Sequence, residues 1–323
     1  MRRVSPEEVK EAAKEELLRK RGVVGISFKH HSPKIIRLYV ERLEPRVMKE
    51  IPKMLLGYKV EVIEVGKVKP LLSPEEKQRK WRVLVPGISI GSCRVTAGTL
   101  GQIAIDNTDG EYVLLSNYHV FYGSEGDPIY APGSYDGGTS EDTVGCLKRY
   151  VEVRADYYNL VDAAIASIKE GVEFSNDSPE LGSPATVRDP VEGETVAKSG
   201  RTTCLTYAKV IDPSATIKVY DYPGVGDVWF DDVIVTECFA AGGDSGSPTI
   251  AVSDGALVGL VFAGSSKITC LIKATNIVRM LDITIITGTP KVGVVRAGLV
   301  PLLGLFAFPF LPEVFKRVKV PLR

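Results

Sequence analysis

From about residue 81 onward, short apolar runs alternate with turns rich in Gly, Asp and Asn. This pattern limits the possible folds more than any other feature of the sequence. Regularly spaced apolar runs bounded by turn residues are typical of strands, so we expect a mainly β domain, built as a sandwich or a pair of barrels. The expected strands are 95–105, 112–120, 128–131, 143–153, 161–168, 185–188, 195–198, 205–211, 215–220, 228–237, 247–252, 256–263 and 268–272. A short helix over 276–281 closes the series.

The pattern of residues 1–80 predicts a separate, small α+β module with the order α-β-β-α-β. Its first helix is expected to begin at Pro6, behind a capping box formed by Ser5 and Glu8, and to end near Gly22. The other expected elements are strands over 23–28, 35–40 and 58–65 and a helix over 44–56. Charged residues at 74–82 indicate a linker. The module is interpreted either as a regulatory cap or as a docking unit, and the short, polar linker favours docking.

The tail, residues 291–323, differs from the rest because the stretch 297–312 carries no charge and holds three prolines. This stretch is shorter than the roughly 20 residues that a membrane-spanning helix needs. We expect it to lie in an interface of a homo-oligomer, and contact with a membrane surface is the less favoured alternative.

Charge and cysteine content exclude several classes of protein. Lys+Arg and Asp+Glu both number 40, so the basic excess of a general nucleic-acid binder is absent. The first residues lack the apolar region of a secretory signal, which predicts a cytoplasmic location. Five cysteines without a CxxC spacing indicate free buried thiols, although pairing of Cys238 with Cys270 stays open. No metal or organic cofactor is implied.

Three residues have the chemistry and the setting of a nucleophilic site. His119 lies at the end of an apolar strand, where an imidazole can reach a substrate as a general base. Asp162 begins another apolar strand, where a partly buried carboxylate can orient an imidazole. Ser245 lies between glycines in the stretch 242–248, and such a turn can expose the hydroxyl and aim backbone N–H groups at one point.

These segments resemble motifs of the chymotrypsin/trypsin superfamily of serine peptidases. The stretch 243–248 is similar to the nucleophile motif, 161–165 to the aspartate motif, and 116–120 to the histidine motif as found in HtrA-like prokaryotic members. Further segments resemble prokaryotic trypsin-like peptidases without signal peptides: 88–91, 95–101, 132–138, 198–203 and 259–265. The resemblance covers roughly 85–285, and it implies a double six-stranded β-barrel for residues 81–290.

The resemblance also implies a role for each site residue. Ser245 would attack the scissile carbonyl, His119 would act as general base and acid, and Asp162 would fix the imidazole tautomer. Backbone N–H groups of Gly243 and Ser245 would form the oxyanion hole. Because HtrA-like members lack an activation peptide, the loop around Ser245 would order itself or be ordered by a partner.

A substrate pocket is implied as well, and four residues are expected to line it: Phe239, Phe262, Ala263 and Gly264. No acid lies at its expected base, so we expect small or medium apolar residues before the cleaved bond. The sequence thus predicts a serine endopeptidase acting on peptides or proteins. The alternative is a scaffold with a protease fold, or an assembly component that cuts only itself.

Overall fold

The computed structural model describes residues 5–66, 72–95, 97–289 and 291–295, and the chain divides into two compact units, 1–70 and 71–323. The elements of the smaller unit are α1 (Pro6–Leu17), β1 (Val23–Lys29), β2 (Ile35–Val40), α2 (Pro45–Glu50), β3 (Met54–Leu55) and β4 (Tyr58–Glu64). Its sheet has the order β1-β2-β4-β3, with β2 and β4 parallel. Val9, Ala13 and Leu17 of α1 share a buried core with residues of the sheet.

The helix expected over 44–56 is shorter, because α2 ends at Glu50 and β3 follows. Pro52 has no N–H to donate and disfavours helical angles at the residue before it. Ile51 accordingly has extended angles, with φ −94° and ψ 121°.

The larger unit holds the remaining elements, and the two-barrel arrangement depends on them. They are α3 (Pro74–Gln78), β5 (Val83–Leu84), β6 (Ser89–Ser92), β7 (Gly98–Thr99), β8 (Gln102–Asp106), β9 (Tyr112–Ser116), β10 (Pro128–Tyr130), β11 (Thr143–Tyr150), β12 (Tyr158–Asn159), β13 (Ala164–Ser167), β14 (Glu173–Ser175), β15 (Thr195–Gly200), β16 (Cys204–Tyr222), β17 (Gly226–Glu237), β18 (Pro248–Ala251), β19 (Leu257–Gly264), β20 (Ile268–Lys273), α4 (Ala274–Leu281), β21 (Ile283–Ile285) and β22 (Val292–Val294).

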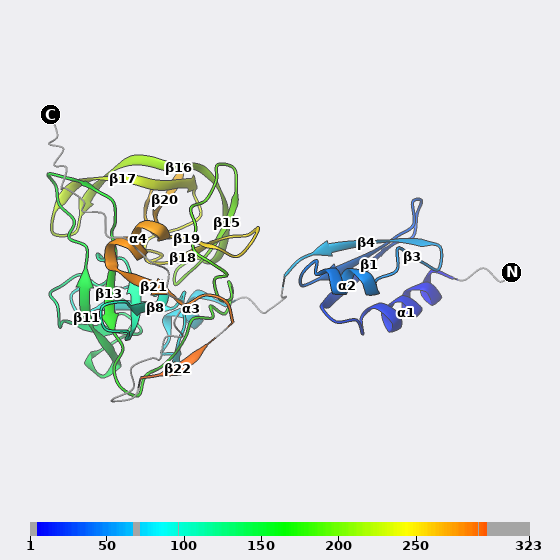
Figure 1. Cartoon of the computed structure of the whole chain (residues 1–323), viewed down its shortest axis with the longest axis horizontal. Coiled ribbons are helices and arrows are strands. Elements are labelled where there is room, and N and C mark those ends of the chain that lie inside the picture. The colour runs from blue at the N-terminus through cyan, green and yellow to red at the C-terminus, as the bar shows by residue number, and fades with distance from the viewer. Residues whose placement is uncertain (1–4, 67–71, 96, 290, 296–323) are drawn as a thin grey trace. The chain divides into compact units, whose positions relative to one another are not determined.

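Two sheets of this unit close on themselves. The second sheet runs β17-β16-β15-β18-β19-β20, and pairing of β17 with β20 closes it into a six-stranded barrel. In the first sheet, β6 pairs with β7, and only Leu100 and Gly101 separate β7 from β8. That connection completes a barrel of β6, β7/β8, β9, β13, β11 and β10. The chymotrypsin-like double β-barrel expected from the sequence is therefore confirmed, and Figure 1 shows its two halves with α4 between them.

Alternation along the strands divides the apolar side chains between two cores. In β9, Leu114 faces the interior of the first barrel, whereas Val113 and Leu115 face a core shared with the second barrel. Phe230 of β17 and Leu260 of β19 contribute to this shared core, and so do side chains of α4. The two barrels are thus packed on each other, which fixes the boundary at which a site can form.

Several segments differ in detail from the sequence prediction. Residues 205–211 and 215–220 belong to one long strand, β16, whose pairing with β17 is interrupted by register shifts. Residues 185–188 form no strand and contribute only an isolated bridge at Val187. The charged stretch 74–82, expected to be a linker, contains α3, which begins with a capping box of Ser73 and Glu76. All five cysteines lie in the described part of the chain and are free, but the expectation that they are buried holds only for Cys270, since Cys93 and Cys238 are exposed.

The predictions for the tail concern residues that lie largely outside the described part of the chain. Only residues 291–295 of the segment 291–323 are described, and β22 pairs there with β14. No helix within the described ranges is long and apolar enough to cross a membrane.

Candidate active site

The first barrel brings His119 and Asp162 together where two neighbouring strands meet. Strand β9 ends at Ser116, which pairs with Ala164, the first residue of the antiparallel strand β13. The chain leaving β9 and the chain entering β13 therefore lie at the same edge of the sheet. His119 Nδ1 lies 2.5 Å from Asp162 Oδ2, so two residues predicted for one site are in direct contact.

The Asp162 carboxylate is completely buried and is held by several donors. Its Oδ1 accepts hydrogen bonds from the backbone N–H of Tyr118 at 2.8 Å, from that of His119 at 3.2 Å, and from the hydroxyl of Tyr222 at 3.0 Å. The side-chain amide of Asn117 donates to the Asp162 carbonyl at 2.7 Å. These bonds replace the hydration that a buried carboxylate loses.

This arrangement decides which imidazole nitrogen is available to a substrate. An ionised carboxylate only accepts hydrogen bonds, so His119 Nδ1 is the donor to Asp162. Nε2 is then the basic nitrogen. Because the His119 side chain is 18% exposed while Asp162 is inaccessible, the pair can exchange a proton with a substrate only through the imidazole.

Ser245 lies in a tight turn between β17 and β18, and backbone hydrogen bonds hold this turn to both barrels. Gly243 and Gly246 both have a φ of 91°, a conformation that favours glycine. A Cβ at Gly246 would come within 2.2 Å of the Thr99 carbonyl oxygen. Thr99 N–H donates to the Ser245 carbonyl at 2.8 Å, and Gly246 N–H donates to the Val261 carbonyl at 2.8 Å. Strands β7 and β19 therefore both hold the serine turn by backbone hydrogen bonds.

Gly98 is the common neighbour of the histidine segment and the serine turn. A Cβ there would lie 2.4 Å from a methyl group of Val120 and 3.1 Å from the Ser245 carbonyl oxygen. The absent side chain lets the residue after His119 approach the turn closely. His119 is hydrogen-bonded to Asp162, and Ser245 lies near this pair. Among the described residues, no hydrogen bond joins Ser245 Oγ to His119.

Among residues 243–247 of the serine turn, two backbone N–H groups are available. Those of Asp244, Gly246 and Ser247 donate to carbonyl groups of the protein. Within the described part of the chain, the N–H groups of Gly243 and Ser245 donate to no protein group. Both residues are only partly buried, so a substrate can reach them. Two N–H groups on one tight turn are the element that an oxyanion hole requires.

Asp244, beside the serine, is buried and paired with the buried ammonium of Lys198 at 3.3 Å. It also accepts from the backbone N–H of Thr202 at 2.9 Å and from the Thr203 hydroxyl at 2.6 Å. Burial alone would raise the pKa of Asp244, but Lys198 and the Thr203 hydroxyl hold that pKa below its usual range. The turn is therefore ordered by a lysine of β15, within the same unit.

Arg201 ties the turn to the first barrel. Its Nε donates to Asp136 Oδ2 at 2.7 Å, and Ser89 donates to the same oxygen at 2.5 Å. Its backbone N–H donates to the Thr99 hydroxyl oxygen at 3.1 Å, and that hydroxyl donates to the Gly243 carbonyl at 3.0 Å. The Gly243 carbonyl thus points at Thr99, which sets the orientation of the adjoining peptide.

The predicted pocket residues lie in two different settings. Phe239 is 7% exposed and belongs to the core inside the second barrel, and Phe262 is 5% exposed and packs on Phe230 with ring centroids 4.8 Å apart. Ala263 is partly buried and Gly264 is exposed. Of the four, Ala263 and Gly264 are accessible to a substrate, whereas Phe239 and Phe262 are buried in two different cores.

Sequence reasoning gave no role to Lys198, Arg201 or Tyr222. Lys198 ends an expected strand directly after Val196 and Ala197, and a lysine that is buried in such a strand is usually part of an ion pair. Tyr222 follows the last expected residue of one strand and precedes a turn, so its environment had no signal in the pattern.

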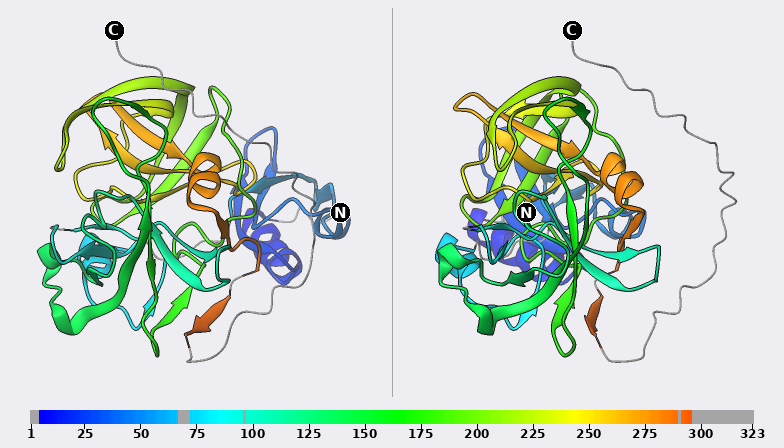
Figure 2. Two further views of the ribbon diagram at one scale, coloured as in Figure 1. Left: turned by 60° about the vertical axis from the view of Figure 1, so that its left-hand side comes forward. Right: turned by 90° about the vertical axis from the view of Figure 1, so that its left-hand side faces the viewer.

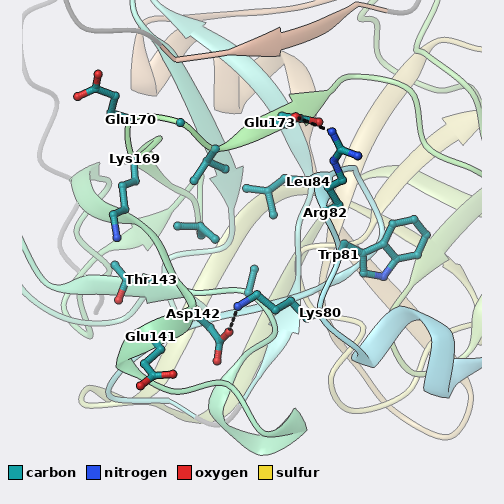
Figure 3. Close-up of a pocket in the computed structure, with 14 residues that line it drawn as sticks. Lys80, Trp81, Arg82, Leu84, Glu141, Asp142, Thr143, Lys169, Glu170 and Glu173 are labelled. Carbon is teal, nitrogen blue, oxygen red and sulfur yellow. Dashed lines mark hydrogen bonds and ion pairs between the residues drawn. The ribbon is translucent and has the colours of Figure 1, made fainter.

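A separate hollow of about 440 Å³ lies away from the His119–Asp162 pair. Figure 3 shows Lys80 paired with Asp142 and Arg82 paired with Glu173 on its wall, at 2.6 and 3.3 Å. None of its lining residues belongs to the predicted active site. Its lining contains neither a serine nor a histidine, so the hollow offers no second nucleophile–base pair.

The chain is similar to known proteins both in structure and in sequence. Solved structures that are similar to this chain include Thermobifida fusca protease A (17% identity, 64% of this chain and 100% of that chain, TM-score 0.49), a Nocardiopsis protease (18%, 63% and 99%, 0.48) and Cellulomonas bogoriensis chymotrypsin (17%, 64% and 99%, 0.46). No curated protein matches the chain. The family model for trypsin matches residues 108–280, more than half of the 323 residues. The chain therefore belongs to the trypsin family.

Proposed function

We propose that the chain is a serine endopeptidase that cleaves peptide bonds through His119, Asp162 and Ser245. The observation that carries this proposal is the bond of 2.5 Å between His119 Nδ1 and the buried Asp162 carboxylate. A buried carboxylate on Nδ1 leaves Nε2 as a base directed outward. Ser245, on its glycine turn beside the same edge, supplies the hydroxyl that such a base activates.

In the proposed reaction, Ser245 Oγ attacks the carbonyl carbon of the scissile bond while His119 Nε2 takes the hydroxyl proton. The imidazolium that forms is stabilised by Asp162. His119 then gives the proton to the leaving amine. The amine departs, and an acyl group stays on Ser245 as an ester. Water, deprotonated by the same nitrogen, hydrolyses that ester and regenerates the enzyme. The bond between Ser245 and His119 need not be formed without substrate, since such bonds often tighten only in the complex.

The N–H groups of Gly243 and Ser245 are proposed to hold the oxyanion of the tetrahedral intermediate. Their lack of a protein acceptor among the described residues supports this role. The ion pair between Lys198 and Asp244 and the bond from Thr99 to the Gly243 carbonyl keep the turn in one conformation. Donors that are fixed before the reaction stabilise developing charge without reorganisation.

Peptides or proteins are the proposed substrates, with a small or medium apolar residue before the cleaved bond. Support comes from Ala263 and Gly264, which are small, uncharged and accessible. Cleavage of a peptide library measures the preference. A profile dominated by Arg would contradict the proposed pocket.

Labelling with a fluorophosphonate probe tests the proposed function, because the probe reacts only with an activated serine. The wild type should be labelled, and Ser245→Ala and His119→Ala should lose labelling and at least roughly 10⁴-fold of peptide hydrolysis. Ser134→Ala, at an exposed serine of the same unit, is the matched control and should behave as the wild type. A folded wild type that resists the probe would favour a scaffold with a protease fold.

A further inference from the structure

We propose that Tyr222 is a positioning residue for Asp162 and His119, a role that rests on the proposed peptidase function. Tyr222 is 4% exposed, and its hydroxyl lies 3.0 Å from Asp162 Oδ1. Its ring meets the His119 imidazole edge to face, with centroids 6.0 Å apart and an interplanar angle of 80°. One side chain of the second barrel therefore contacts both members of the pair in the first barrel.

The hairpin of β16 and β17 explains how the side chain reaches this position. The two strands pair from Val210 and Thr236 to Tyr222 and Gly226, so Tyr222 is the last residue of β16 before the turn. In both views of Figure 2 the yellow-green pair runs along the outer side of the second barrel. Within the turn, a Cβ at Gly224 would lie 2.4 Å from the Tyr122 hydroxyl, which places the tip of the hairpin against the segment that follows His119.

The exposure pattern near the tip separates Tyr222 from its neighbours. Tyr220, two residues earlier, is 67% exposed and has its ring under the Lys218 ammonium at 4.6 Å. Tyr222 faces the other way, into the core between the barrels, and its ring lies 6.0 Å from that of Phe230. The hairpin thus has one tyrosine in solvent and one against the catalytic pair.

Tyr222 completes the coordination of one carboxylate oxygen. Oδ1 of Asp162 accepts three bonds, and two of them come from backbone N–H groups of the His119 segment. The third, from Tyr222, crosses between the barrels. With Oδ1 occupied in this way, Oδ2 faces His119 Nδ1 and the carboxylate cannot rotate without breaking these bonds.

The phenol remains a donor over the working pH range. Burial and the adjacent Asp162 carboxylate raise the pKa of Tyr222 well above its ordinary value. The other titratable groups that face Asp162 and Tyr222 are His119, Tyr118 and Tyr122. Burial raises the pKa of Tyr118 to about 12, so this phenol is neutral as well. Within the described residues, no lysine, arginine or second carboxylate bonds to Asp162. A change in the basicity of the Asp162 carboxylate should therefore act on the protonation of His119.

The decisive variant is Tyr222→Phe, which removes the donor and keeps the ring. An Asp162 carboxylate that has lost a donor attracts the imidazolium more strongly, so the protonated form of His119 persists to higher pH. We expect the acidic limb of the kcat/KM profile to move up by roughly 0.5 pH unit and kcat to fall roughly 10-fold, with KM little changed. Tyr220→Phe, the same change on the same hairpin, should alter neither.

A second measurement does not depend on activity. The chain has only three histidines, so the carbon-bound ring protons of His119 can be assigned by comparison with His119→Ala and titrated by NMR. The midpoint in Tyr222→Phe should exceed that of the wild type by roughly 0.5 pH unit, and that of Tyr220→Phe should not. The same titration can be run in the Ser245→Ala background, where no peptide is cleaved.

These readouts keep the two proposals apart. An unshifted His119 titration in folded Tyr222→Phe would overturn the role of Tyr222, whatever the activity of the wild type. A wild type that resists the fluorophosphonate probe would overturn the peptidase function, while the titration would still decide whether Tyr222 tunes the pair. A Tyr222→Leu variant, which also lacks the ring, should lose more kcat than Tyr222→Phe if the contact with His119 contributes.

Discussion

Replacing Lys77 with methionine should strongly destabilise the larger unit, because it would leave a buried carboxylate without its partner. Lys77 belongs to α3 and is 1% exposed, and its ammonium lies 2.5 Å from Glu180 Oε2. The Lys77 ammonium also donates to Ser199 Oγ, and that hydroxyl donates to Glu180 at 2.8 Å. The Glu180 side chain is 2% exposed, and its Oε1 has no hydrogen-bond partner among the described residues.

The magnitude follows from this burial. Removing one member of a buried ion pair costs about 3–5 kcal/mol, since the remaining charge is neither hydrated nor compensated. With roughly 2–4 °C of melting temperature per kcal/mol for a domain of this size, the expected fall for Lys77→Met is about 6–20 °C. The double variant Lys77→Met/Glu180→Met removes both charges and should melt closer to the wild type than either single variant does.

Thermal melting of the full chain, followed by circular dichroism, measures all three variants. Lys80→Met is the matched control, because the Lys80 side chain is 67% exposed in its pair with Asp142. An exposed pair contributes little, so this control should melt close to the wild type. The reasoning would be refuted if Lys77→Met and Lys80→Met lost the same stability, or if the effects of the Lys77 and Glu180 replacements simply added.

Three further predictions concern the same unit. Asp162→Asn should lower kcat/KM for a chromogenic peptide by about 10⁴-fold, since the amide favours the wrong imidazole tautomer, and full activity would contradict the proposed role. Because the folded-state pKa of Asp244 is lowered, its pairing with Lys198 adds stability above about pH 4 that is lost as the pH falls through the lower folded value. Urea unfolding at about pH 6 and about pH 3 should thus differ less in Asp244→Asn than in the wild type. A chain beginning at Leu71 should keep the melting temperature of the larger unit, whereas one beginning at Trp81 lacks α3 and should melt much lower; equal melting would contradict the anchoring role of this helix.

Local patterns were sufficient where the physical cause was local. The short apolar run along β9, which follows a turn rich in Asp, Asn and Gly, predicts a strand, and the structure has that strand. The capping box at Ser5 marks the start of α1 for the same kind of reason. The similar box at Ser73 was obscured by the surrounding charges, so a stretch expected to be a linker is in fact α3.

Contacts that cross between segments had no such signal. The Tyr222 hydroxyl meets a carboxylate 60 positions earlier, and the Thr99 hydroxyl meets the Gly243 carbonyl 144 positions later. Nothing in a window of strand length encodes either pairing, because each depends on how the closed barrels pack. The burial of Phe239 also had no signal in the sequence. The resemblance implied that Phe239 lines a pocket, and in the structure this side chain belongs to the core of the second barrel.

These crossing contacts explain why neither barrel would hold the site alone. The first barrel carries His119 and Asp162, but one of the donors that hold the carboxylate is Tyr222, from the second barrel. The second barrel carries Ser245, but the N–H of Thr99, from the first, fixes the serine carbonyl. Each half thus orders the proposed reactive group of the other, and a substitution that loosens the packing between the barrels should disturb both the imidazole and the serine turn. The site is a property of the interface, which is why its chemistry depends on residues that no single motif contains.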